Sequence, residues 1–409
     1  RLVGSEMCIR DRLLLIKPVY MNLKILIDLS YISTFDKLRE SVAMYAVRVI
    51  SEWNNIGMVH FCVLVHENMK DIIVEKIPNF SMEIYPVDNS IISKIPYLRG
   101  IYRIVKWHRV VSRLEFDVIY MPFCWSGNSL KVKGKKVITI HDLRPMRVAE
   151  RFLSDTWWFK VLGLKKVYLE ISKYFFGRHL KNAWKVICIS KYVRDDVKQM
   201  WPAYSYKLHT IYNGVSISQF SIKPLLISED WQYILYVNSL AKYKNLLTLI
   251  KAYKLHYDTL KTFKIVIVGK ATDYWKSEVF PYIKINHLEN HVSHLDYVSD
   301  QELRWLYEHA KVFVTTSIHE GFGYTPIEAA ICGCPVISSR SESLSDVTAD
   351  KLFYYTPATS EKSLAQCLES VLFFPPKINS LLEISSFFKE RYSQTVLSEK
   401  ILNLLVENA

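Results

Sequence analysis

Short apolar runs alternate along the chain with segments whose apolar residues recur every three or four positions. The runs are rich in Val, Ile, Leu and Tyr, and several are apolar at nearly every position, as expected for strands covered on both faces. They predict strands at residues 23–29, 60–66, 116–121, 136–140, 185–190, 208–213, 233–238, 263–269, 293–298, 311–317 and 335–339. Strands that alternate with helices are typical of βαβ units around parallel sheets, so the pattern predicts an α/β fold.

Two of the intervening segments carry clear helix signals. Apolar residues at i, i+3, i+4, i+7 and i+8 predict a helix with one buried face over residues 42–50. Ser299 and Glu302 flank Asp and Gln ahead of an apolar run, which is the spacing of a capping box. We therefore expect a helix to begin just after Ser299.

The length of 409 residues predicts two domains, at about 100–200 residues each. The alternation pauses between Asn213 and Asp230 and then restarts. We expect one α/β domain over residues 21–215 and another over 216–389. Residues 1–20 begin with RLVGSEMCIRDR, which has no clear period, and we expect them to be a non-native leader.

Basic residues outnumber acidic ones by 53 to 40, and the excess is concentrated in one segment. Residues 91–220 hold 24 basic and 8 acidic residues, a net charge of +16. Within this segment, residues 97–114 and 157–168 mix Lys and Arg with Trp and aliphatic residues. This mixture suits the interface of an anionic membrane, and it equally suits a solvated face with core contacts. No nucleic-acid motif accompanies the charge, so nucleic acid is not expected as a partner.

Two further observations concern the cellular compartment. No apolar run reaches the ~18 residues that a membrane span needs. The seven cysteines show no metal or redox spacing, and Cys332 and Cys334 lie in an apolar run that favours packing. We therefore expect a reducing, cytoplasmic location, with the inner face of the cytoplasmic membrane as the place of any peripheral association.

The segment 315–339 carries the candidate chemistry. A strand there is followed by Glu320 and a Gly-Phe-Gly loop, and then by a helix start with Thr325 predicted as N-cap, Pro326 at N1 and Glu328 at N3. The helix is expected to stop at Gly333. Glycine amides ahead of a helix N-terminus form an anion site. From the residues alone, Glu328 is equally explained as a cap and Glu320 as a solvated carboxylate.

Glu320 and Glu328, eight residues apart around Gly-Phe-Gly, resemble the E-x7-E signature of retaining nucleotide-sugar glycosyltransferases of family 4, the group 1 glycosyltransferases. Segments similar to those of the same family are TIHDLRPMRVAERFL, AWKVICISKYVRDDV, TIYNGV, YILYVNSLAKYKNLLTLIKAY and YVSDQELRWLYEHAKVFVTTS. The resemblance implies a GT-B fold, in which two Rossmann-like domains face a central cleft. It further implies that the N-terminal domain binds the acceptor, that the C-terminal domain binds the donor, and that a final helix at about 390–409 crosses back.

The resemblance also implies roles for single residues. Glu320 matches the signature glutamate beside the donor sugar and the reacting centre, and Glu328 matches the one that holds the nucleotide ribose. The loop amides are implied to face the diphosphate or the sugar, and they belong to Gly321, Phe322 and Gly323. Lys244 matches the lysine of the diphosphate, and His141 matches a catalytic-loop histidine that lines the sugar site.

The chain also departs from the family pattern. Asn238 and Ser239 stand at the donor loop where many members have Gly and Arg, and Lys242 is a candidate to replace the missing cation. The glycine-rich loop after the first strand is absent, and Asp346 stands where Glu is commoner.

The resemblance implies a retaining hexosyltransferase, with a nucleotide sugar as donor and a glycan or lipid-linked saccharide as acceptor. Similarity to mannosyl- and rhamnosyltransferases of surface-polysaccharide and lipopolysaccharide assembly favours GDP-mannose, with a UDP-sugar as the second choice. No metal and no further cofactor is implied. The alternatives are a nucleotide-sugar epimerase on the same fold and a non-catalytic relative that binds sugar nucleotides or a membrane.

Overall fold

The computed structural model describes residues 23–34, 41–53, 59–87, 96–124, 128–143, 146 and 164–407. They form two compact units. The first contains the described residues up to Cys188 together with Val197–Ile211 and Thr395 onward, and the second contains Ile189–Asp196 and Tyr212–Gln394. The expected leader at 1–20 and most of the basic stretch at 157–168 lie outside the described residues.

The first unit is built on a seven-stranded parallel sheet with the order β3-β2-β1-β4-β5-β6-β7. Its strands are β1 (Lys24–Leu29), β2 (His60–His66), β3 (Ser81–Tyr85), β4 (Val118–Met121), β5 (Lys135–Ile140), β6 (Lys185–Cys188) and β7 (Leu208–Thr210). The central strands are almost fully buried, which explains their continuous apolar sequence.

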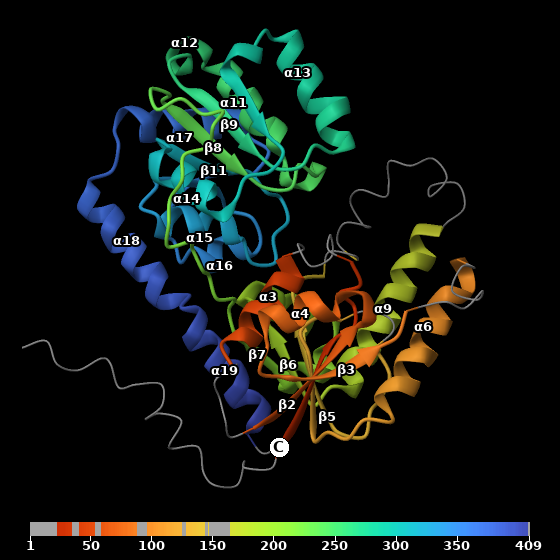
Figure 1. The fold of residues 1–409 in the computed structure, drawn as a ribbon. Coiled ribbons are helices and arrows are strands. Elements are labelled where there is room, and N and C mark those ends of the chain that lie inside the picture. The colour runs from red at the N-terminus through yellow and green to blue at the C-terminus, as the bar shows by residue number, and fades with distance from the viewer. Residues whose placement is uncertain are drawn as a thin grey trace, which may run out of the picture. The chain divides into compact units, whose positions relative to one another are not determined.

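Helices flank this sheet (Figure 1). They are α3 (Ser41–Ser51), η2 (Glu67–Met69), α4 (Lys70–Lys76), α6 (Pro96–Val111), α9 (Leu164–Asn182), η5 (Pro202–Lys207) and α19 (Gln394–Val406). Helix α10 (Lys191–Met200) is divided, because its residues up to Asp196 are grouped with the second unit and the rest with the first. The predicted helix over 42–50 is confirmed as α3. Trp53, just after α3, is buried, and its indole N–H donates to the carbonyl of Ser398 in α19 at 3.1 Å. The last helix of the chain thus completes the core of the first unit.

The second unit has a six-stranded parallel sheet with the order β10-β9-β8-β11-β12-β13. Its strands are β8 (Tyr233–Val237), β9 (Lys264–Val268), β10 (Val292–Leu295), β11 (Val312–Thr315), β12 (Val336–Ser339) and β13 (Phe353–Tyr355). The fold class is therefore confirmed as α/β with two Rossmann-like parallel sheets.

Helices also surround the second sheet (Figure 1). They are η6 (Lys242–Lys244), α11 (Leu246–Leu255), α12 (Tyr257–Leu260), the π-helix η7 (Trp275–Val279), α13 (Phe280–Ile285), η8 (Glu289–His291), α14 (Asp300–His309), α15 (Tyr324–Ile331), α16 (Ser343–Val347), α17 (Glu361–Phe373) and α18 (Ile378–Arg391). The predicted capping box is confirmed at the start of α14, where the Ser299 and Glu302 side chains each bond the other's backbone amide. Apolar residues of α11, α13 and α17 pack with β8 and β9 into one core.

The structure corrects two local predictions. β3 and β13 were not predicted, since both are edge strands and β3 is mostly exposed, so neither carries a long apolar run. Thr325 is not an N-cap: α15 begins at Tyr324, and the N-cap is Gly323, which has a φ of +90° and makes no side-chain cap bond. The left-handed glycine turns the chain into the helix two residues earlier than the Thr-Pro pair indicated.

Candidate active site

The candidate site lies at the carboxyl ends of β8 and β11. These strands are neighbours, but the chain leaves β8 toward β9 on one side and β11 toward β12 on the other. This is the topological switch point of the sheet, where the loops diverge and open α/β sheets bind their ligands. Lys244 follows β8 and Glu320 follows β11, so the fold brings together two residues that are 76 positions apart.

Lys244 is held in place through its backbone. Its carbonyl accepts a 3.0 Å hydrogen bond from the Tyr236 hydroxyl in β8 and a 2.8 Å bond from the Thr316 hydroxyl just after β11. The next residue, Asn245, has a φ of +57° and is the N-cap of α11. Lys244 is only 7% exposed, so its ammonium group is confined to the switch point.

The Lys244 ammonium forms an ion pair with Oε1 of Glu320. The same oxygen accepts a 2.9 Å hydrogen bond from Ser317 Oγ, and the Glu320 side chain is 12% exposed. Removing two charges from water costs about as much as their attraction returns, so a buried pair is weak evidence of a stabilising role. The pair places one cation and one carboxylate side by side in a site with little water.

The loop Gly321–Gly323 follows Glu320 and is buried. Two of its carbonyls accept hydrogen bonds: Ser190 Oγ donates to Gly321 O at 2.9 Å, and Ser343 Oγ donates to Phe322 O at 3.4 Å. Its three amides donate no hydrogen bond to any residue that the structure describes. Consecutive amides of this kind, close to a lysine and a helix N-terminus, can hold an anion.

Glu328 projects from α15 and accepts a 3.0 Å hydrogen bond on Oε2 from the Tyr307 hydroxyl in α14. Tyr307 is buried, and burial followed by the neighbouring carboxylate raises the pKa of its hydroxyl well above the usual range. Tyr307 is therefore a permanent hydrogen-bond donor that orients the Glu328 carboxylate.

The other predicted donor-loop residues have different surroundings. Asn238 Nδ2 lies 3.4 Å from Ser317 Oγ, and its Oδ1 accepts from the Ser239 amide. Lys242 is exposed and pairs with Glu278 at 3.0 Å, so its ammonium group is engaged outside the Lys244–Glu320 pair.

Asp346 has a local structural role. Its two carboxylate oxygens accept hydrogen bonds of 2.8 Å from the Lys191 amide at the start of α10 and from the Tyr212 hydroxyl. It therefore holds the start of α10 and the Tyr212 ring within the second unit.

His141 belongs to the first unit and follows β5, at a strand carboxyl end as the sequence predicts. Its Nε2–H donates to the carbonyl of Pro122 at 2.8 Å, and the ring packs edge-on against Tyr45. The ring orientation is thus fixed by contacts inside the first unit.

Sequence reasoning missed Ser317, Tyr307 and Glu342. The Glu342 carboxylate accepts from the Glu320 amide, and its partner His319 precedes Glu320. A hydroxyl residue at the end of a buried strand was a usable signal for Ser317. Tyr307 and Glu342 lie on neighbouring elements, so no local spacing pointed to them.

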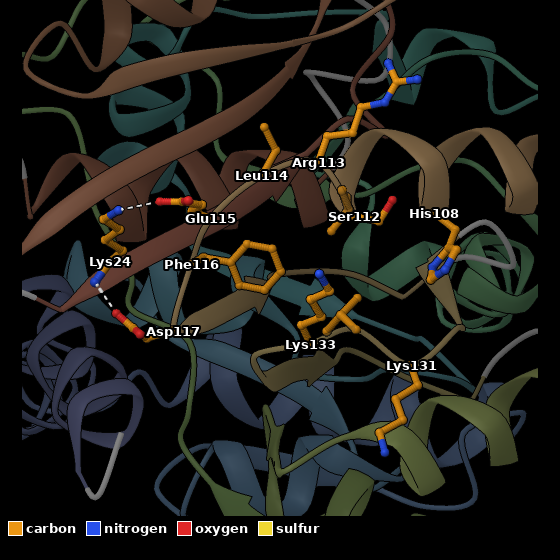
Figure 2. Close-up of a pocket in the computed structure, with 12 residues that line it drawn as sticks. Lys24, His108, Ser112, Arg113, Leu114, Glu115, Phe116, Asp117, Lys131 and Lys133 are labelled. Atoms are coloured by element: carbon orange, nitrogen blue, oxygen red, sulfur yellow. Dashed lines mark hydrogen bonds and ion pairs between the residues drawn. The ribbon is translucent and has the colours of Figure 1, made fainter.

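A separate hollow of about 1030 Å³ lies in the first unit at the amino ends of its strands, away from the carboxyl-end loop of His141 (Figure 2). Both of its acidic residues accept 2.9 Å hydrogen bonds from Lys24: Glu115 from the ammonium group and Asp117 from the backbone amide. None of the residues named for the candidate site lines it. Among the described residues no three His, Cys, Asp or Glu side chains cluster as metal ligands, and no described helix has both the length and the apolar character to span a bilayer.

Comparison with known proteins assigns the family. A model described as glycosyl transferases group 1 matches residues 218–380, and a model described as Glycosyltransferase Family 4 matches residues 57–219. The O-antigen chain mannosyltransferase RfbU of Salmonella typhimurium is 28% identical over 70% of this chain and 73% of its own length. O-antigen chain mannosyltransferase B of Escherichia coli is 32% identical over 47% of this chain and 52% of its own length.

Solved structures agree on the fold. The HepE protein of Anabaena, solved with UDP and glucose, is 16% identical, with a TM-score of 0.67 over 94% of this chain and 99% of its own. Sucrose-phosphate synthase of Thermosynechococcus elongatus is also 16% identical, with a TM-score of 0.66 over 93% and 98%. The two family models together span residues 57–380, which include the whole second sheet and every strand of the first except β1, and the chain therefore belongs to the group 1, family 4 glycosyltransferases and has the GT-B fold.

Proposed function

We propose that the chain is a retaining hexosyltransferase that moves a mannosyl group from GDP-mannose to a glycan or lipid-linked saccharide during surface-polysaccharide assembly. The observation that carries this proposal is the buried Lys244–Glu320 pair beside the open amides of Gly321–Gly323. The mannosyl donor and the pathway are supported by similarity to O-antigen mannosyltransferases, RfbU among them.

In this proposal the second unit holds the donor. Departure of a nucleoside diphosphate builds negative charge on the leaving group, and Lys244, the three loop amides and the N-terminus of α15 can stabilise it electrostatically. These groups supply positive charge at the point where a metal ion acts in other transferases, and we expect transfer to need no metal.

The two signature glutamates act on different parts of the donor. Glu328, already oriented by Tyr307, accepts hydrogen bonds from the ribose hydroxyls. Glu320 lies beside Lys244 and accepts from hydroxyls of the sugar near the reacting carbon. His141 contributes from the acceptor-binding unit, where its ring is fixed by Pro122.

The reaction balances without a cofactor. The bond between the sugar anomeric carbon and the diphosphate oxygen breaks, and its electron pair leaves with the diphosphate. An acceptor hydroxyl forms the new glycosidic bond on the same face and releases one proton. The products are nucleoside diphosphate, the glycosylated acceptor and a proton.

A panel of GDP-, UDP- and dTDP-sugars, with and without a lipid-linked saccharide acceptor, tests the proposal. We expect nucleoside diphosphate release from GDP-mannose that depends on acceptor, survives EDTA, and gives a product with the donor's anomeric configuration by NMR. Acceptor-independent conversion to a free sugar would indicate the epimerase instead. Tight nucleotide binding without turnover would contradict the assignment.

We also propose that the first unit associates with an anionic membrane surface. Helix α6 exposes Ile101 and Val105. The hollow at its carboxyl end is lined by the exposed cations Arg113, Lys131 and Lys133, together with Leu114 and Phe116 (Figure 2). These three cations have no partner among the described residues. Apolar and cationic groups on one surface favour anionic lipid, and such a surface would hold the enzyme near a lipid-linked acceptor.

A further inference from the structure

Glu342 has a backbone conformation that is unfavourable for its residue type. Its φ is +48° and its ψ is −122°, a region that glycine adopts freely and other residues rarely enter. It occupies the N-cap position of α16 but makes no side-chain cap bond. A glutamate here therefore costs conformational energy, and no capping bond offsets that cost. Any offset must come from other contacts of its side chain.

The Glu342 carboxylate makes two hydrogen bonds at the candidate site. Oε1 lies 2.5 Å from Nδ1 of His319, and Oε2 accepts a 3.0 Å bond from the backbone amide of Glu320. The Glu342 side chain is 17% exposed and His319 is 5% exposed, so solvent competes little for these bonds. Nδ1 of His319 donates, because the other partner is a carboxylate.

The Glu320 residue is consequently fixed on both sides of its α-carbon. Its amide donates to Glu342, and its carbonyl accepts a 2.7 Å bond from Ser343 Oγ, the residue next to Glu342. Its side chain is then directed to Lys244 and Ser317. The loop 342–343 thus determines where the Glu320 backbone sits relative to Lys244.

We propose that Glu342, through its bridge to His319 and to the Glu320 amide, is a positioning residue that sets the orientation of Glu320 for transfer. This inference rests on the proposed function, in which Glu320 acts beside the donor sugar. A displacement of about 1 Å at a reacting group lowers rates by up to ~10²-fold, so a residue that does not touch substrate can control turnover.

Four variants of the full chain separate positioning from fold maintenance. Glu342→Gly removes the bridge and relieves the unfavourable φ. Glu342→Asn also removes it, since its side chain is too short to span both partners, and it keeps a non-glycine residue at this φ and ψ. Glu342→Gln is the conservative rescue. It keeps both bonds if His319 carries its proton on Nε2, because the Gln side-chain NH2 can then donate to Nδ1 while the Gln oxygen accepts from the Glu320 amide. Asp350→Gly is the matched control, because Asp350 has a φ of +53° but is exposed and pairs only with Arg340 among the contacts described.

The assay is steady-state GDP release from GDP-mannose, with lipid-linked saccharide or water as acceptor, together with GDP affinity and melting temperature. We expect Glu342→Gly and Glu342→Asn to lower kcat at least tenfold, with GDP affinity and donor KM changed less than threefold and no large fall in melting temperature. Glu342→Gln should retain kcat within about threefold, and Asp350→Gly should match the wild type.

Glu320→Gln keeps the two proposals distinguishable. If Glu320→Gln retains full turnover, the proposed function of Glu320 fails. If Glu320→Gln loses turnover while Glu342→Gly and Glu342→Asn keep wild-type kcat, only the positioning role is overturned. A loss that follows melting temperature in all Glu342 variants would also overturn it.

Discussion

The hydroxyl of Tyr307 in α14 donates a hydrogen bond to the carboxylate of Glu328 in α15, so one helix orients an acceptor that the next helix carries. The Tyr307 hydroxyl is buried and has a strongly raised pKa, and it stays protonated over the working pH range. The Glu328 carboxylate is therefore preorganised before any ribose arrives.

Replacement of Tyr307 by Phe should weaken donor binding while the chemical step is little changed. Hydrogen bonds to charged groups contribute about 1.5–3 kcal/mol, and only part of this is lost because the ribose hydroxyls can still bind. We expect a three- to tenfold rise in donor KM with kcat within twofold. Isothermal titration with GDP should show the same weakening, and an unchanged GDP affinity would contradict the role given to Tyr307.

The Lys244–Glu320 pair should show strong coupling in stability. Removal of one member of a buried pair leaves an uncompensated charge and costs about 3–5 kcal/mol, whereas removal of both costs less. We expect Lys244→Met to lower the free energy of unfolding by roughly 3 kcal/mol, and the double variant with Glu320→Gln to recover part of that loss. Urea unfolding of the four proteins in the cycle measures the coupling.

Strictly additive effects in that cycle would show that the two side chains do not interact. The solvent-exposed Lys242–Glu278 pair is the matched control, since exposed pairs contribute about 0–1 kcal/mol.

Gly323 should not tolerate a side chain. Its φ is +90°, and a Cβ there would lie 2.6 Å from Cδ2 of Leu344. Gly333 has a similar φ of +79° but open space around its Cβ position, so it isolates the backbone effect. We expect Gly333→Ala to cost about 1 kcal/mol and Gly323→Ala clearly more, with a rise in donor KM for Gly323→Ala alone. Equal costs in thermal unfolding would argue against the contact with Leu344.

Lys136 in β5 should make the free energy of unfolding depend on pH in the alkaline range. It is buried, its ammonium group donates to the carbonyls of Asn128 and Leu130, and burial lowers its pKa to about 8. The unfolded chain keeps a pKa near 10.5, so between pH 8 and 10.5 the unfolded state binds more protons and stability rises with pH.

The comparison is between the wild type and Lys136→Met. Their difference in unfolding free energy should be flat below about pH 8 and then shift in favour of the wild type by roughly 3 kcal/mol up to pH 10.5. Urea unfolding at four pH values measures it. A difference that stays constant through this window would show that Lys136 has an ordinary pKa.

The cationic surface of the first unit should bind anionic vesicles. We expect the chain to sediment with vesicles rich in phosphatidylglycerol, weakly with phosphatidylcholine, and less at high salt because exposed charges are screened. Reversal of Arg113, Lys131 and Lys133 to Glu should reduce binding at least tenfold, since each basic residue contributes about 1 kcal/mol. Reversal of Lys261 and Lys276 in the second unit is the control, and binding indifferent to lipid charge would defeat the proposal.

Most strands of both sheets were predictable because strands buried on both faces are apolar at nearly every position. The run at 60–66 matches β2 from end to end. The edge strand β3 escaped prediction because Ser81 and Glu83 interrupt its apolar positions and one edge of the strand faces away from the sheet. Thr325 was misplaced because a local capping pattern was overridden by the left-handed Gly323 just before it.

Lys244 and Glu320 were each predictable as candidates from the resemblance, but their direct contact was not. It depends on the strand order, which places β8 beside β11 only after both βαβ series are formed. The role proposed for Glu342 could not be predicted from the sequence. It depends on a backbone angle and on two hydrogen bonds across a loop, and neither produces a periodic pattern of residues.

The placement of α19 has a consequence for biosynthesis. Leu397, Ile401 and Leu405 are buried in α19, the helix whose Ser398 carbonyl binds Trp53, yet α19 is synthesised after the whole of the second unit. The second unit is nearly continuous in sequence and can close before them. The first unit, although its sheet is synthesised first, must keep part of its apolar surface open until α19 has been synthesised, and this interval is when we expect the nascent chain to depend most on chaperones.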